Sequence, residues 1–216
     1  MIALSWDMHV HFGAESEARW GGAAQIARAA ANASMHGVLL KHHGRNTVGD
    51  AAAVVDGDVT VLGSISLNPW STLTDLVDAI DAGGRWVWAP TRAASESGSP
   101  WDLELPSWWA EAERAMVDSG KSFVLATGHL RADERLRIAR TAQRHGWLCS
   151  VTHSGYVRET DARRLAEIGC VFEFDLYTWL HPVVGRPSYD LVATLSDAAA
   201  RGRSAYITSD AGQAST

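Results

Sequence analysis

The sequence of 216 residues contains little lysine and no long apolar run. Lys41 and Lys121 are the only lysines among 19 basic residues, and the formal net charge is −6. Since nucleic-acid affinity depends on clustered lysine and arginine, we expect no nucleic-acid partner. A membrane span needs about 18 to 20 consecutive apolar residues, and a signal peptide needs a basic segment before an apolar one, so we expect neither. The sequence therefore predicts a cytoplasmic protein.

Cysteine is equally scarce, because the chain contains only Cys149 and Cys170. The two lack the C-x-x-C spacing of a metal or redox motif and lie within apolar segments, so we expect buried free thiols. Hydrophobic residues make up 46% of the chain and charged residues 20%, which is typical of a folded globular protein. The length fits one domain spanning residues 1–216.

Short β-branched or aromatic runs alternate with longer amphipathic stretches, a pattern typical of βα units around a parallel sheet. Strands are predicted at residues 3–9, 37–43, 60–67, 85–89, 122–128, 147–152, 170–176 and 204–209. Helices are predicted at residues 15–32, 47–56, 72–82, 107–119, 131–145, 160–168 and 187–201. Several strands are apolar almost throughout, which suits strands covered on both faces. The sequence therefore predicts an α/β fold, a (β/α)8 TIM-type barrel that lacks its final helix or has that edge covered by another copy in a homo-oligomer.

Polar side chains stand where the predicted strands end. In a (β/α)8 barrel, catalytic groups project from the C-terminal strand ends. The first strand leads into His9 and His11, whose side chains point to the same side of an extended chain. Imidazole and carboxylate suit zinc and other first-row divalent ions. We expect one or two ions, zinc first with manganese or iron as alternatives, and the candidate ligands are His9, His11, His43, His129, His153 and Asp210. The alternative is a set of hydrogen-bonded polar residues at the barrel rim.

These residues resemble the amidohydrolase superfamily of metal-dependent hydrolases. The pattern of that family is His-x-His after the first strand, His after the fifth and sixth, and Asp after the eighth. The resemblance covers the whole chain in strand order, and it matches His9, His11, His129, His153 and Asp210 one by one.

The resemblance is strongest to a small branch whose second strand ends in Leu-Lys-x-His, here residues 40–43, and whose last strand runs into Ser-Asp-x-Gly-Gln, here residues 209–213. Many members with two metals carry a carboxylated lysine after the fourth strand, where this chain has Trp-Ala-Pro-Thr at residues 88–91. That departure favours a site with one ion, or an unusual second site.

Lys41 ends an apolar strand in a chain that uses arginine almost everywhere else, which suggests a specific use for an amine. Three roles are open: binding an anionic group of the substrate, bridging a second metal after carboxylation, or acting as a desolvated amine with a lowered pKa. The structural alternative is an ion pair with Glu173 or Asp175, which share one face of the seventh predicted strand.

The main hypothesis is a metal-dependent hydrolase that uses metal-activated water on an amide, a lactone or ester, or a phosphoester of a small molecule. Asp210 is expected to accept the proton of the water and pass it to the leaving group, and an ion or His153 to polarise the reacting oxygen. The substrate contacts expected are Lys41, Arg92, and Trp101 in a long loop, residues 91–106, that is expected to cover the barrel mouth. The alternatives are a decarboxylase or deaminase on the same metal site, or a non-catalytic metal-binding barrel subunit.

Overall fold

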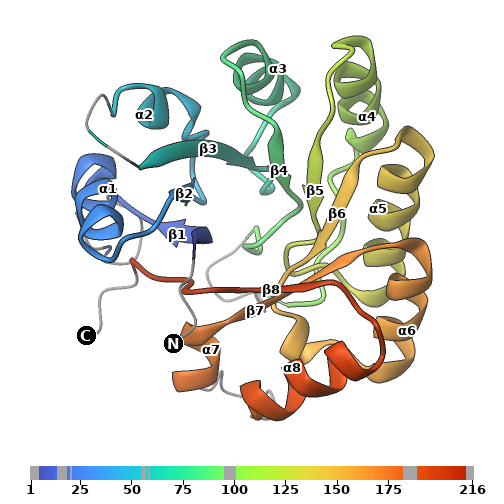
Figure 1. Cartoon of the computed structure of the whole chain (residues 1–216). Helices are drawn as coiled ribbons and strands as arrows, with labels where there is room; N and C mark the ends of the chain where they lie inside the picture. The colour runs from blue at the N-terminus through green and yellow to red at the C-terminus, as the bar shows by residue number, and fades with distance from the viewer. Residues whose placement is uncertain are drawn as a thin grey trace.

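The computed structural model of the chain describes residues 5–13, 19, 21–54, 57, 59–94, 101–181 and 189–212. Within them, eight strands form one sheet in chain order, and each neighbouring pair is parallel. The strands are β1 (Trp6–His11), β2 (Gly37–Lys41), β3 (Thr60–Ser66), β4 (Trp86–Trp88), β5 (Val124–Ala126), β6 (Leu148–Val151), β7 (Val171–Asp175) and β8 (Ala205–Thr208). The helices are α1 (Ala23–Asn32), α2 (Val48–Ala52), α3 (Leu73–Asp81), α4 (Trp109–Asp118), α5 (Ala132–His145), η1 (Ser154–Tyr156), α6 (Glu159–Ile168), α7 (Leu176–Leu180) and α8 (Leu191–Ala200). The strands surround a common centre and most helices lie outside them (Figure 1), which confirms the (β/α)8 TIM barrel.

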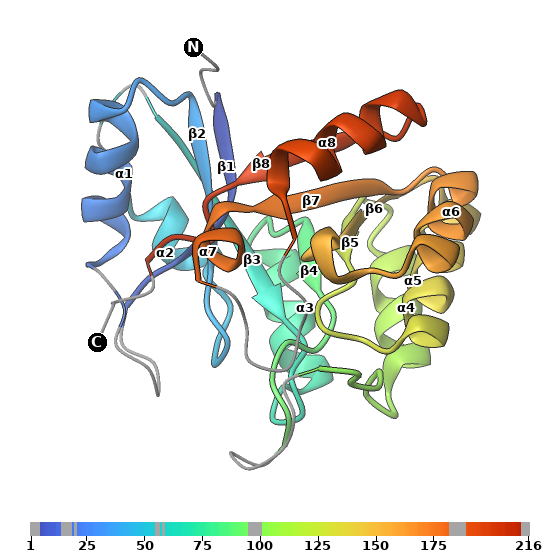
Figure 2. The ribbon, with the colours of Figure 1, turned by 90° about the horizontal axis from the view of Figure 1, so that it is seen from below.

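The barrel closes between β1 and β8, which lie side by side in Figure 2. The backbone N–H of His11 donates to the carbonyl oxygen of Ala211 at 2.8 Å. The buried carboxylate of Asp7 accepts from the backbone N–H of Ser209 at 3.0 Å, and from the hydroxyls of Thr208 and Ser209. Because these contacts join β1 to the C-terminal end of β8 and the loop after it, they bring that end next to the two histidines of β1.

The main hydrophobic core lies between the strands and the surrounding helices, because each strand of a parallel barrel is covered from outside. Leu125 of β5 packs there with residues of α3 to α6, among them Leu76, Met116, Ile138 and Leu165. Cys149 and Cys170 belong to the same core and are both buried and free, as expected.

The structure corrects the prediction at the end of the seventh strand. Leu176 is predicted to be in the strand but begins α7, because the carboxylate of Asp175 accepts from the backbone N–H of Thr178 at 2.7 Å and caps a helix there. The short helix η1 was not predicted either. All eight predicted strands are present in the described residues.

Several predicted segments lie partly outside the described residues: the first strand at residues 3–4, the first helix at 15–18 and 20, the second helix at 55–56, the loop over the mouth at 95–100, and the last helix at 187–188. After β8, the described residues continue to Gly212 and contain no helix. Among the described residues, no helix combines the length and apolar character needed to cross a membrane.

Candidate metal centre

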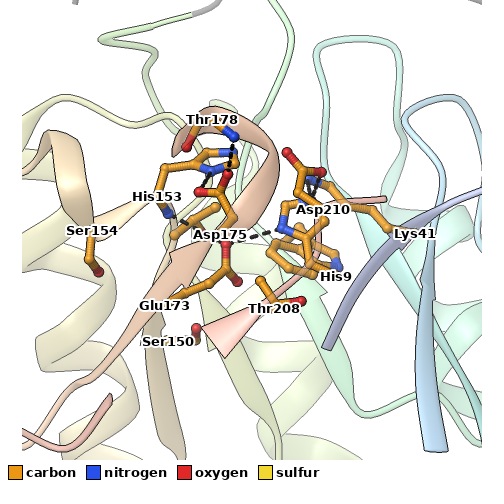
Figure 3. A network of polar contacts seen from close by, with 12 residues as sticks. His9, Lys41, Ser150, His153, Ser154, Glu173, Asp175, Thr178, Thr208 and Asp210 are labelled. Atoms are coloured by element: carbon orange, nitrogen blue, oxygen red, sulfur yellow. Dashed lines mark hydrogen bonds and ion pairs between the residues drawn. The ribbon is translucent and has the colours of Figure 1, made fainter. Parts of the chain in front are cut away.

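Three donor atoms converge where β1 and β8 end (Figure 3). The Nε2 atoms of His9 and His11 are 3.3 Å apart. Each of them lies 3.3 Å from Oδ1 of Asp210. The three side chains are buried, with 0%, 2% and 3% of their residue surface exposed. The structure thus brings together three of the six residues that the sequence suggests as ligands.

The dimensions of this triangle fit one divalent ion. Donors that bind zinc tetrahedrally at about 2.0–2.1 Å lie about 3.3–3.4 Å from one another. Burial, and next the nearby Lys41 charge, lower the pKa of His9 to about 3 and hold the pKa of His11 well below its usual range. Both imidazoles are therefore neutral at pH 7 and keep a lone pair for a metal. His9, His11 and Asp210 would hold such an ion.

The loop after β8 reaches this position through two unusual backbone conformations. Asp210 adopts a positive φ of 49°, which is uncommon for residues other than glycine. Gly212 has a φ of 86°, and a Cβ atom there would lie 1.7 Å from the carbonyl oxygen of His11. Only glycine therefore allows the end of β8 to lie against β1 so closely.

Two carboxylates of β7 orient two histidines. Glu173 Oε1 lies 3.0 Å from Nδ1 of His9, and Asp175 Oδ2 lies 2.7 Å from Nδ1 of His153 (Figure 3). Since an ionised carboxylate only accepts hydrogen bonds, each Nδ1 carries the ring hydrogen. Each of the two carboxylates thus has an imidazole partner.

The same contacts shift the pKa of His153 in the direction opposite to that of His9. Burial lowers the pKa of His153, but the carboxylates of Asp175, Asp210 and Glu173 together raise it by more, so the net shift is upward. The pKa of Asp175 falls correspondingly, although burial acts to raise it. The Asp175 carboxylate therefore favours the protonated form of His153.

A second group of donors consists of His153, Asp175 and Asp210, whose ligand atoms lie within 4.8 Å of one another. Both oxygens of Asp175 already accept hydrogen bonds, one from His153 and one from Thr178. Within this group, His153 and Asp175 are already joined by a hydrogen bond.

Lys41 projects into the barrel interior, with 1% of its surface exposed. Its Nζ lies 2.8 Å from Nε2 of His9 and 4.4 Å from the ring centroid of Trp88. A buried lysine beside a candidate ligand indicates a role in this site.

The other two candidate ligands lie beside the triangle but outside the donor groups found among the described residues. The His43 ring is 4.7 Å from that of His11, and its Nδ1 is hydrogen bonded to Thr91 Oγ1 at 2.7 Å. His129 stacks on Trp101 with 4.2 Å between ring centroids. Their role as ligands stays a prediction.

The Trp101 ring lies against the rings of His129 and His153, and its role as a substrate contact stays a prediction. Its segment is tied to the loop after β5 by backbone hydrogen bonds from Leu103 to His129 and from Arg131 to Leu103, both 3.0 Å long. The ring also lies 5.6 Å from that of His153. The described part of the long loop thus lies over the β5 and β6 side of the site.

Asn68, which follows β3, is a residue that the sequence analysis missed. Its side-chain amide donates to the carbonyl oxygen of His43 at 2.9 Å and accepts from the backbone N–H groups of Thr91 at 2.8 Å and Arg92 at 2.9 Å. It therefore fixes the ends of β2 and β4 relative to each other. An asparagine directly after a buried strand, before Pro69, was the available signal.

Tyr206 of β8 was missed as well. Its hydroxyl donates to Glu173 Oε2 at 2.8 Å and contacts Ser150 Oγ at 2.8 Å. Tyr206 lies two residues before Thr208 on β8, and nothing in the sequence around it indicates this contact.

Comparison with known proteins supports the fold. Residues 5–106 match the model of a family of unknown function, DUF6282. Comparison with curated proteins gives no significant match. The structure is similar to that of ATU3138 from Agrobacterium tumefaciens, with a TM-score of 0.57 and 13% identity over 95% of this chain and 80% of that one.

The structure is also similar to that of ochratoxinase from A. niger, with a TM-score of 0.50 and 13% identity. That match covers 98% of this chain and 63% of the other, so this chain spans less than two thirds of the length of ochratoxinase. At such identities the likeness establishes the fold alone, and this chain shares the barrel fold that its resemblance to the amidohydrolase superfamily implies.

Proposed function

We propose that this chain is a metal-dependent hydrolase in which His9, His11 and Asp210 hold one divalent ion, most simply zinc. The observation that carries the proposal is the triangle of donor atoms, 3.3 Å on each edge, at the catalytic end of the barrel. A bound divalent ion polarises a carbonyl or phosphoryl oxygen and lowers the pKa of a coordinated water. His43 and His129 would supply the additional ligands for a larger coordination sphere or for a second ion.

Asp210 is the general base of the proposed reaction. Burial raises its pKa, so that the carboxylate is a better proton acceptor than one in water. It takes a proton from the attacking water and delivers it to the leaving group. Its Oδ1 lies 3.3 Å from Nε2 of both His9 and His11, at the proposed reacting centre.

His153 is the electrophile. Asp175 holds the proton on Nδ1 and stabilises the positive charge, which leaves the Nε2–H to donate to the oxygen that gains negative charge in the transition state. A fixed donor of this kind needs no reorganisation during the reaction.

The substrate proposed is a small amide, ester, lactone or phosphoester with an anionic group and a flat or apolar portion. Lys41 and Arg92 supply positive charge on the β2 and β4 side. Trp101 offers an aromatic face on the other side of the mouth. The two sides of the site thus suit two different parts of one molecule.

The test has two stages. Metal content is measured after loading the protein with zinc, manganese or iron, and the loaded protein is assayed on a panel of amides, lactones, esters and phosphoesters. Hydrolysis that requires metal supports the proposal. Release of CO2 or ammonia without a panel hit would point to a decarboxylase or deaminase, and bound metal with no turnover to a binding protein.

A further inference from the structure

Lys41 shares its hydrogen-bond acceptor with the proposed metal site. Its Nζ lies 2.8 Å from Nε2 of His9, the atom that forms one corner of the donor triangle. The side chain is almost fully buried and lies at the end of β2, where Lys41 pairs in register with His11 of β1. Figure 3 shows Lys41 approaching the same ring that faces Asp210.

Nε2 of His9 can serve only one partner at a time. Its ring hydrogen is on Nδ1, which faces Glu173 at 3.0 Å, so the single lone pair of the neutral ring is on Nε2. A lysine ammonium has three donors and no acceptor, and it must therefore use that lone pair. A metal ion needs the same lone pair.

The surrounding charges favour a cation at this position. Glu173, Asp175 and Asp210 are all buried on the side of β7 and β8. Burial raises the pKa of both Glu173 and Asp210, and the nearby positive charge of Lys41 acts in the opposite direction. Without a positive charge nearby, these buried carboxylates would be costly to ionise.

Building on the proposed metal site, we propose that Lys41 is an internal cation that occupies Nε2 of His9 and is displaced when a divalent ion binds, so that it sets the metal affinity. A lysine suits this role because its compact ammonium group is carried on a flexible side chain and can move to a new position. The planar guanidinium group of arginine is better suited to ion pairs of fixed geometry. Lys41 is one of two lysines in a chain whose other basic residues are arginines.

The test compares the zinc affinity of the wild type with that of Lys41→Met, which keeps the length of the side chain and removes the charge. Zinc alone is titrated in competition with a coloured chelator, and folding is checked by circular dichroism. Releasing one hydrogen bond to a charged group changes an equilibrium by about ten- to a hundredfold, so Lys41→Met should bind zinc at least about tenfold more tightly. Lys121→Met is the matched control, because Lys121 donates to the carbonyl of Ile80 on the outer side of the barrel and should leave the affinity unchanged.

Equal or weaker zinc binding by a folded Lys41→Met protein overturns the proposal while leaving the metal site intact. If neither the wild type nor the variant binds zinc, the proposed hydrolase function fails together with it.

A second measurement uses the wild type and needs no variant. With 15N-labelled lysine, the two lysines give two Nζ signals. The buried Lys41 ammonium should exchange its hydrogens slowly before zinc is added and rapidly at saturation, while the Lys121 signal stays unchanged. Slow exchange that persists in the zinc-saturated protein contradicts displacement.

Discussion

Replacing Glu173 by glutamine isolates the contribution of one buried negative charge to metal binding. Glu173 is fully buried and accepts from His9 Nδ1 at 3.0 Å and from the Tyr206 hydroxyl at 2.8 Å. Glutamine has the same size and can keep both contacts through its oxygen and nitrogen. The main change is therefore the loss of the charge that makes Nε2 of His9 a stronger donor to a metal.

The zinc affinity of Glu173→Gln should fall by about ten- to a hundredfold, the usual effect of removing a group that orients a metal-binding histidine. The free energy of unfolding of the metal-free protein should change by less than about 1 kcal/mol, because the pKa of Glu173 is already raised by burial and the neutral amide avoids that cost. Chelator competition gives the affinity and urea titration gives the stability. Zinc affinity equal to that of the wild type would refute the argument that Glu173 acts through His9.

Three further outcomes follow from the structure. Asp210→Asn should reduce kcat on any substrate found by about a hundred- to ten-thousandfold while zinc analysis still shows much of the metal, because the amide oxygen can remain a ligand but cannot accept the proton; undiminished turnover would exclude Asp210 as the base. Gly212→Ala should lower the free energy of unfolding by about 2 kcal/mol or more in urea titration, because the new Cβ would meet the carbonyl of His11; an unchanged midpoint would show that the loop after β8 can move away without cost. Glu113→Gln should destabilise the contact between α4 and α5 by about 0.5–1 kcal/mol at pH 7. Burial raises the pKa of Glu113, but hydrogen bonds from His145 and Arg144 outweigh that effect and lower it. The stability that the Glu113 carboxylate contributes is therefore present above its unfolded pKa of about 4.3 and is lost as the pH falls through its lower folded pKa. A difference in stability between wild type and variant that persists at pH 2 would contradict this.

The parts of the site that were predictable from sequence are those fixed by strand ends. His9 and His11 alternate on one strand, and Asp210 follows another, so the barrel topology alone places them at the same rim. The fold was equally accessible, because runs of apolar residues mark strands that are covered on both faces.

The roles of Glu173 and Asp175 depend on tertiary detail that sequence does not carry. The alternation of residues predicts that the two share a face of β7. Which side chains they contact depends on the stagger between β7 and strands β1 and β6. The change from strand to helix at Leu176 has a similar origin, since Asp175 serves both as a helix cap and as the partner of His153. Asn68 forms hydrogen bonds with backbone groups, and no sequence motif indicates where those groups lie.

The most direct test of the proposed metal centre is an anomalous X-ray map recorded at the zinc edge from crystals grown with zinc. The account predicts a peak about 2.0–2.2 Å from Nε2 of His9, Nε2 of His11 and an oxygen of Asp210. A zinc-loaded crystal with no peak inside this triangle, or with its zinc bound elsewhere, would contradict it.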